Sequence, residues 1–331
     1  MIWITIFILS FLVLFWSGSR LVKYLMSMAK YMGWREFVVA FFVMAFAGSL
    51  PNLFVGINSA LHGISELSFG EIVGGNVIDM TLAIALAILI GGRALPVRSK
   101  MVQTSTIFTA VIAVLPLILI IDSDLGRGDG LILLLAFAIY IFWLFSKEER
   151  FRRVYSFKEK KPTLLNFLAY KNRAKGVREF VKFIKTFFKT IFALMLLLLA
   201  SFGIVQSVKV FSDTLSVSIP VIGILMVGLV NTLPETYFAI VSARKGRTWL
   251  ILGNLMGSVI VCSTLVLGIV VLIHPIDNID FSPFAIARIF LIISAVFFFI
   301  VVRTDKKITK KEGVILLLIY IFFLLSEIFF K

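Results

Sequence analysis

The sequence predicts an all-α polytopic membrane protein in which ten transmembrane helices form two inverted five-helix repeats. Three observations predict this fold: the composition, the number of long apolar stretches, and an internal sequence repeat. The chain has 331 residues, of which 60% are hydrophobic and 15% are charged. Soluble domains are about 45–50% apolar and about 25% charged. The composition therefore excludes a soluble enzyme, a disordered chain and a coiled coil.

Ten apolar stretches approach the length of about 20 residues that one membrane crossing requires. They fall at 2–17, 37–61, 67–92, 101–121 and 130–146, and then at 190–208, 217–243, 249–273, 283–302 and 313–330. We expect residues 1–146 to form the first repeat, 147–189 a basic cytoplasmic loop, and 190–331 the second, inverted repeat. The first stretch has no basic segment before it and no small-residue cleavage site, so we expect a retained helix and not a signal peptide.

The basic residues predict the orientation of these helices. The chain carries 33 Lys and Arg residues and a net charge of +15. All of them follow odd-numbered helices except Arg127, Lys209, Arg288 and Lys331. By the positive-inside rule, the basic side faces the cytoplasm and both termini face outward across the cell membrane. The charge then reflects topology, and we expect no nucleic-acid partner.

The central segment has the pattern of a basic amphipathic helix. Arg178, Lys182, Lys185 and Lys189 recur on one helical face, and phenylalanines supply the other. Such a helix lies in the headgroup layer and binds anionic lipid. A calcium-sensing role is disfavoured because the acidic residues of this segment are scattered.

The internal repeat appears when the chain is aligned with itself so that Pro51 falls on Pro234. The same register, without a gap, aligns Gly63 with Gly246, Gly70 with Gly253, and Gly74 with Gly257. The loop after the first proline has no basic residue, whereas the loop after the second has Arg244, Lys245 and Arg247. The two copies therefore enter the membrane from opposite sides. Inverted repeats with interrupted helices indicate a secondary transporter site.

A proline interrupts an expected span in each repeat, within 48–52 and within 231–235. Proline lacks an N–H, so we expect carbonyls one turn earlier, around Ala45 and Gly228, to be freed toward a cavity. A packing kink is the alternative for one such helix. Two symmetric kinks flanked by hydroxyl, amide or carboxylate side chains favour a binding site.

Two carboxylates, Asp79 and Glu235, lie deep in apolar sequence without a nearby Lys or Arg in the same span. An ionised carboxylate in the bilayer is costly unless it is paired or binds an ion. A bound cation or a proton is the expected partner, with Arg288 as an alternative counter-ion. Two carboxylates balance one divalent cation, and calcium prefers about six to eight oxygen ligands. Neutral oxygens are available from Ser49, Asn52, Thr232 and Ser258.

Two further acids are weaker candidates. Glu71 lies two turns before Asp79, where it either lines an access path or is solvated near a helix end. Glu327 lies near the end of the last helix, and we expect it at the membrane interface.

The motifs at 48–52 and 231–235, each followed by a glycine-rich helix through 74–79 or 257–262, resemble the α-repeats of the cation/calcium exchanger superfamily. The likeness is strongest to prokaryotic sodium/calcium exchanger-like members and covers essentially the whole chain. It implies a cation site between helices 2, 3, 7 and 8 of two inverted halves. It also implies that helices 1 and 6 slide across the other eight helices for alternating access.

The resemblance implies ligand positions residue by residue. The family's glutamates match Asn52 and Glu235, its neighbouring hydroxyls Ser49 and Thr232, its serines Gly75 and Ser258, its last polar pair Asp79 and Cys262, and its carbonyls Ala45 and Gly228. Asn52, Gly75 and Cys262 depart from the family pattern, which puts coupling to sodium in question. Proton coupling through Asp79 or Glu235 is one alternative, and a softer divalent metal held by the Cys262 thiol is another.

The function expected from these features is secondary cation antiport, with calcium exported in exchange for sodium. Proton-coupled exchange of calcium or another divalent cation, and a transport-inactive relative, are the alternatives. A membrane enzyme such as a lipid-headgroup transferase is disfavoured because the acids lie beside the kinks and not at a water-facing helix end. We expect inorganic cations and membrane lipid as partners, no cofactor, and a monomer.

Overall fold

The computed structural model describes residues 2–32, 44–97, 100–146, 173–246, 248–277, 280, 282–304 and 307–329. Within these ranges the chain is helical apart from two short strands and the connecting turns. The first repeat contains α1 (Ile2–Tyr31), α2 (Met44–Gly48), α3 (Leu50–Leu61), α4 (Ser65–Met80), α5 (Leu82–Gly91), β1 (Leu95–Pro96), α6 (Lys100–Leu119), η2 (Ile120–Asp122) and α7 (Arg127–Ser146). The second contains α10 (Arg173–Leu215), α11 (Ile219–Ile222), η3 (Gly223–Val227), α12 (Gly228–Arg244), α13 (Trp249–Val261), η4 (Cys262–Val266), α14 (Leu267–Ile273), η5 (Ser282–Phe284), α15 (Ala285–Thr304), β2 (Lys307–Ile308) and α16 (Lys310–Phe329).

Nine helices of the described ranges are long and apolar enough to cross a membrane. The remaining predicted span, 37–61, corresponds to α2 and α3, which meet at Ser49, and its first residues lie outside the described ranges. Most of the predicted loop at 147–189 also lies outside them, as do the basic residues Arg35, Arg98, Arg247, Lys306 and Lys331. The chain is thus a multi-pass membrane protein whose helices follow the predicted order.

The α1 helix is longer than the sequence predicts. It ends at Tyr31, whereas the predicted apolar stretch ends at residue 17. Arg20 and Lys23, which we expected in a loop, lie within this helix, and the Arg20 guanidinium carbon is 5.5 Å from the ring centroid of Trp16. Lys and Arg are good helix formers, so the helix does not end where the apolar run ends. The α10 helix likewise runs without a break from Arg173 into the predicted span, and the interfacial placement of its first part stays a prediction.

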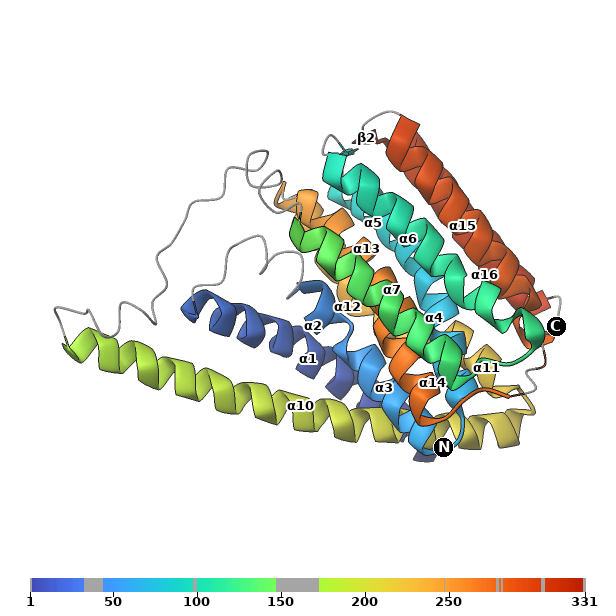
Figure 1. Ribbon diagram of the computed structural model, residues 1–331, viewed down its shortest axis with the longest axis horizontal. Helices are drawn as coiled ribbons and strands as arrows, with labels where there is room; N and C mark the ends of the chain where they lie inside the picture. The colour runs from blue at the N-terminus through green and yellow to red at the C-terminus, as the bar shows by residue number, and fades with distance from the viewer. Residues whose placement is uncertain are drawn as a thin grey trace.

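The α1–α10 pair forms a layer of its own along one edge of the bundle (Figure 1). Phe7 and Phe211 pack at one end of the pair with ring centroids 5.5 Å apart, and Tyr31 stacks on Phe183 at the other end at 4.6 Å. The pair shares one hydrophobic core with α2 and α3, to which α4, α11 and η3 each add one buried residue, Leu67, Ile222 and Val227. A second core joins α4, α5, α6, α7 and α12–α16. The helices predicted to move therefore share little apolar packing with most of the bundle.

The inverted repeat appears in the backbone geometry. Gly63 and Gly246, which the internal repeat aligns, both occupy left-handed turns with φ of 72° and 70°. β1 pairs with β2 in antiparallel register through Leu95 and Ile308, and an isolated bridge joins Leu125 to Ile276. These two loop contacts follow α5 and α6 respectively, so they lie at opposite ends of the bundle.

The backbones of α4 and of the α11–η3–α12 segment are in direct contact. A Cβ atom built on Gly74 would lie 2.3 Å from the carbonyl oxygen of Ile224, and one on Gly70 would lie 2.4 Å from that of Pro220. The glycine-rich sequence of α4 allows this approach. η3 and η4 are π-helical, a geometry that is frequent at functional sites. The contact brings the polar residues of the two repeats together in the middle of the bundle.

Candidate functional site

The carboxylates of Asp79 and Glu235 meet beside the Ser258 hydroxyl. Asp79 lies at the end of α4 and Glu235 on α12, and each is nearly completely buried. The Ser258 hydroxyl, from α13, donates to Glu235 Oε1 at 3.2 Å and is also a hydrogen-bonding neighbour of the Asp79 carboxylate. One hydroxyl proton cannot serve both carboxylates at once. The site therefore carries more acceptor oxygens than donors.

Asn52 and Cys262, which lie 210 residues apart in sequence, occupy the other side of this site. The Asn52 amide nitrogen donates to the Cys262 thiol sulfur at 3.1 Å, and both side chains are buried. The Ser49 hydroxyl is a further hydrogen-bonding neighbour of the thiol. The structure thus joins Asn52 of one predicted pair to Cys262 of another, across the two repeats.

The carbonyls of Ala45 and Gly228 are not free, so this sequence-based expectation is wrong. The Ser49 hydroxyl donates to the Ala45 oxygen at 3.0 Å, and the Thr232 hydroxyl donates to the Gly228 oxygen at 2.8 Å. The backbone N–H of Ser49 also bonds Ala45, at 3.1 Å. Proline at position 51 removes the donor for the carbonyl four residues earlier, which is that of Ala47. The two hydroxyl oxygens keep lone pairs that could bind a cation.

Three acceptor oxygens of the site have no hydrogen-bond partner among the described residues. They are Asn52 Oδ1, Asp79 Oδ1 and Glu235 Oε2, and none of the three residues is more than 4% exposed. An unsatisfied buried polar atom costs about 1–3 kcal/mol, and a charged one costs more. A cation can bind all three oxygens at once, because each has a free lone pair and two of them belong to carboxylates. Arg288, considered as a counter-ion, lies on α15.

Small residues border the carboxylates. A Cβ atom on Gly75 would lie 3.3 Å from Thr232 Cγ2, and one on Gly48 would lie 3.6 Å from Glu235 Oε1. Gly75, which matches a serine of the family pattern, therefore faces the site but offers no side-chain ligand. No three His, Cys, Asp or Glu side chains of the described ranges gather around a metal position. Ser, Thr and Asn oxygens would have to complete any cation shell.

Sequence reasoning missed or misplaced several buried polar residues of the bundle. Asn76 donates to the Ser263 hydroxyl at 2.7 Å, and Asn231 donates to Glu71 Oε1. Glu71 is 1% exposed, so it is not solvated at a helix end. Glu327 is fully buried inside the bundle and does not face solvent. The available signal was the presence of single Asn and Glu residues in otherwise apolar helices.

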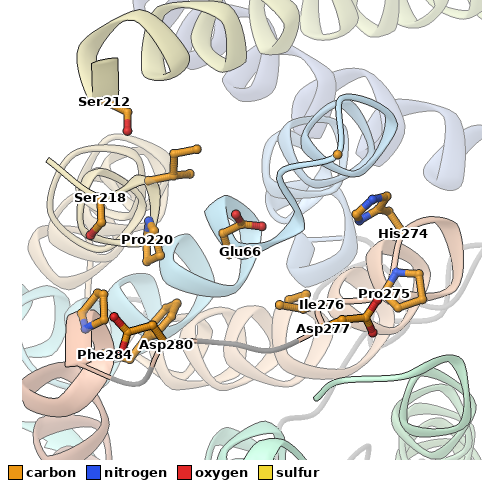
Figure 2. A pocket seen from close by; sticks show the side chains of 13 residues that line it. Glu66, Ser212, Ser218, Pro220, His274, Pro275, Ile276, Asp277, Asp280 and Phe284 are labelled. Carbon is orange, nitrogen blue, oxygen red and sulfur yellow. The ribbon is translucent and has the colours of Figure 1, made fainter. Parts of the chain in front are cut away.

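A cavity of about 530 Å³ opens at the end of the bundle that carries Gly63 and His274 (Figure 2). The view places Glu66 between His274 and Pro220, with Asp277 and Asp280 on the opposite wall. The backbone N–H and hydroxyl of Ser282 both bond Asp280 and hold the pKa of its carboxyl below its usual value. The described residues that line the cavity include three acids and no Lys or Arg.

The sequence matches known membrane proteins along most of its length. The model of the family described as "Sodium/calcium exchanger protein" matches residues 2–146 and 185–329. The "Inner membrane protein YrbG" of Escherichia coli strain K12 is 25% identical over 293 residues, which cover 88% of this chain and 86% of that protein. The "Sodium/calcium exchanger MaX1" of Methanosarcina acetivorans is 24% identical over 310 residues, 85% of each chain.

The fold also matches solved structures. The sodium-calcium exchanger NCX_Mj soaked with 2.5 mM Na⁺ and 1 mM Sr²⁺ superposes with a TM-score of 0.66 at 20% identity, covering 98% of both chains. The same exchanger soaked with 10 mM Na⁺ and zero Ca²⁺ gives a TM-score of 0.64 at 22% identity, with the same coverage. At these identities the likeness shows that this chain has the fold of that exchanger.

Proposed function

We propose that this chain, which belongs to the sodium/calcium exchanger family, exports calcium across the cytoplasmic membrane in exchange for sodium. The family consists of cation exchangers, which are secondary transporters and not enzymes. The choice of calcium and sodium is our proposal, supported by the name of the Methanosarcina relative and by the donor set of the site.

The arrangement of Asp79 and Glu235 carries this proposal. The two carboxylates come from different repeats, share the Ser258 hydroxyl, and each keep one oxygen without a partner. Their combined charge balances one divalent cation, and hard oxygen ligands suit calcium. Asn52 Oδ1 and the hydroxyls of Ser49 and Thr232 add neutral oxygens to the proposed shell, and the carbonyls of Ala45 and Gly228 lie directly behind those hydroxyls.

The remaining residues of the proposed site have secondary roles. Gly75 keeps the space beside Thr232 open. Cys262 binds the Asn52 amide through its sulfur and leaves the amide oxygen for the ion. A neutral thiol is a poor ligand for a hard cation, so we assign Cys262 a positioning role.

Alternating access would use the separate α1–α10 layer. This pair shares its apolar core mainly with α2, α3 and η3, whereas most of the apolar packing of the helices that carry Asp79, Glu235 and Ser258 is in the other core. Movement of the layer would expose the site to one side at a time. We further propose that both termini lie outside, because the basic residues gather at the opposite end of the helices. We also propose that the exchanger is a monomer.

Calcium flux into proteoliposomes tests the proposal. An outward sodium gradient or an outward proton gradient is imposed separately on vesicles that contain the wild type, Glu235→Gln, or the matched control Asp122→Asn. Asp122 is an exposed acid in η2, far from the site in sequence, and its variant should transport like the wild type. Glu235→Gln loses one charge-assisted ligand, a loss of about 1.5 kcal/mol, which should reduce its rate of calcium uptake at least tenfold.

The two gradients separate the proposal from its alternatives. Uptake driven only by the proton gradient would replace sodium by protons as the coupling ion, an outcome that the neutral residues Asn52 and Cys262 make worth testing. Transport by Glu235→Gln at the wild-type rate would refute the site. The absence of calcium uptake under both gradients would refute calcium antiport.

A further inference from the structure

A second buried polar pair lies beside the central site. Glu71 of α4 accepts a hydrogen bond from the amide nitrogen of Asn231 on α12, and the two residues are 1% and 0% exposed. The pair joins the two repeats, as Asp79 and Glu235 do. Neither Glu71 nor Asn231 belongs to the ligand set of the proposed exchange site.

The pair has two acceptor oxygens without a partner. Glu71 Oε2 and Asn231 Oδ1 are both buried, and neither accepts a hydrogen bond from a described residue. The charged group that acts on Glu71 is another acid, Glu235. A buried carboxylate with an acid as its charged neighbour is costly unless a cation joins it. The amide oxygen beside it is a hard, neutral ligand of the kind that alkali and alkaline-earth cations accept.

The pair lies between the cavity of Figure 2 and the central site. Along α4, Glu66 lines the cavity, Glu71 follows, and Asp79 lies at the end of the helix. The chain that enters α12 follows the same order, because Pro220 lines the cavity and the pair residue Asn231 precedes Glu235 by four positions. Four residues are one helical turn, about 6 Å. The pair therefore lies at a depth between the cavity and Glu235, and a cation could reach it from the cavity only if the backbones of α4 and η3, which are in contact here, moved apart.

The cavity itself favours cations. Glu66, Asp277 and Asp280 face it, and none of the described lining residues is Lys or Arg (Figure 2). Lys209 lies near its rim, where it donates to the His62 carbonyl oxygen at 3.1 Å. Ser282 donates to Asp280 at 2.9 Å through its N–H and at 2.8 Å through its hydroxyl, which stabilises the ionised form. A concave surface with charges of one sign raises the local concentration of counter-ions. The cavity would therefore concentrate cations at this end of the bundle.

We propose that Glu71 and Asn231 form a second cation site, which binds a monovalent ion such as sodium. One carboxylate balances one positive charge, whereas a divalent ion would leave the site with an excess charge. The inference rests on the proposed function in one respect, since it assigns this ion as the coupling ion of the exchanger. It would give the coupling ion a carboxylate ligand of its own, outside the site where Asn52, Gly75 and Cys262 have replaced the family's ligands.

Thermal unfolding of the purified full chain in detergent tests the second site directly. Sodium chloride is titrated against choline chloride at constant ionic strength, without calcium, and the sodium concentration at half-maximal stabilisation is measured. Glu71→Gln keeps the shape of the side chain and removes its charge, and Asn231→Ser removes the amide oxygen. We expect the half-maximal sodium concentration to rise at least tenfold in both variants and to stay unchanged in Asp122→Asn.

A calcium titration of the same proteins separates this inference from the proposed function. Glu71→Gln should keep its stabilisation by calcium, and Glu235→Gln should lose it while keeping that by sodium. If calcium does not stabilise the wild type but sodium does so through Glu71, the second site stands and the calcium proposal fails. Equal stabilisation of the wild type by sodium and choline would overturn the second site. An unchanged sodium dependence in Glu71→Gln would also overturn it. If Glu71→Gln does not fold, an unchanged sodium dependence in Asn231→Ser would overturn it instead.

Discussion

Replacing Gly74 with alanine should separate α4 from η3 and disturb the carboxylate site. The added Cβ would lie 2.3 Å from the Ile224 carbonyl oxygen and 2.9 Å from the Ile224 carbonyl carbon, both of which are backbone atoms. Backbone atoms cannot move aside as the end of a flexible side chain can. The neighbouring Gly75 provides the matched control, because its Cβ would meet only Thr232 Cγ2, at 3.3 Å.

The expected magnitude follows from two opposing terms. Overpacking a close helix contact costs about 1–3 kcal/mol, and replacing glycine by alanine within a helix gains up to about 1 kcal/mol. Because the added Cβ meets backbone atoms, the upper part of the overpacking range applies, and Gly74→Ala should lose about 1–2 kcal/mol of unfolding free energy. Gly75→Ala should be neutral or slightly stabilised, because the helix term outweighs one mild contact.

Thermal unfolding in detergent measures this difference. Gly74→Ala should unfold several degrees below Gly75→Ala, and calcium should stabilise it less, because Asp79 lies on the same helix as Gly74 and moves with it. Equal unfolding temperatures for the two variants would show that α4 and η3 are not in the backbone contact described above. Lower stability with an unchanged calcium response would instead refute the link between this contact and the site.

Two further predictions concern single hydroxyl groups. Ser258→Ala removes the donor to Glu235 Oε1 and one oxygen ligand. The loss of about 1.5 kcal/mol of binding free energy should raise the calcium concentration for half-maximal stabilisation about tenfold. An unchanged concentration would exclude Ser258 from the cation shell. Ser282→Ala should raise the pKa of Asp280 toward its usual value, because the hydroxyl helps to lower it. The stability that Asp280 contributes is present above its unfolded-state pKa and is lost as the pH falls through the lowered folded-state pKa. NMR titration of the Asp280 carboxyl in the two proteins would measure the change, and identical titration curves would contradict it.

The sequence allowed the repeat and its central residues to be predicted, because they depend on local rules. Pro51 and Pro234 stand in register in the internal repeat, and Gly63 and Gly246 occupy the same left-handed turn. Positive φ is available to glycine at little cost, so these two positions retain glycine. Asp79 was identifiable because a carboxylate in an apolar helix needs a partner.

Other features could not be predicted because they depend on contacts between distant residues. The bond between Asn231 and Glu71 joins positions 160 residues apart, and its geometry follows from the close approach of two glycine-bearing backbones. The hydroxyls of Ser49 and Thr232 reach back to carbonyls of their own helices, a choice that the sequence alone leaves open. The true end of α1 was missed because hydropathy falls at Arg20 while helix propensity does not.

The repeat also shows that the two ends of the site are not equivalent. The register that places Pro51 on Pro234 also aligns Glu71 with Asn254 and Asn231 with Gly48. These equivalents are neighbours as well, because a Cβ atom on Gly48 would lie 4.0 Å from Asn254 Oδ1. Only the first pair carries a charge, and in an inverted repeat the second pair lies toward the opposite side of the membrane. The monovalent site would therefore be present at one end only.

Exchanging the charge between these positions tests that asymmetry. Glu71→Asn should lose most of the stabilisation by sodium, and adding Asn254→Glu should restore part of it. The recovery should be incomplete because Gly48, unlike Asn231, offers no amide oxygen to the ion. The measurement is the sodium titration of unfolding in the single and double variants, with choline as the ionic-strength control. If the double variant responds to sodium no better than Glu71→Asn alone, a carboxylate at this depth is insufficient, and the particular contact with Asn231 makes the site.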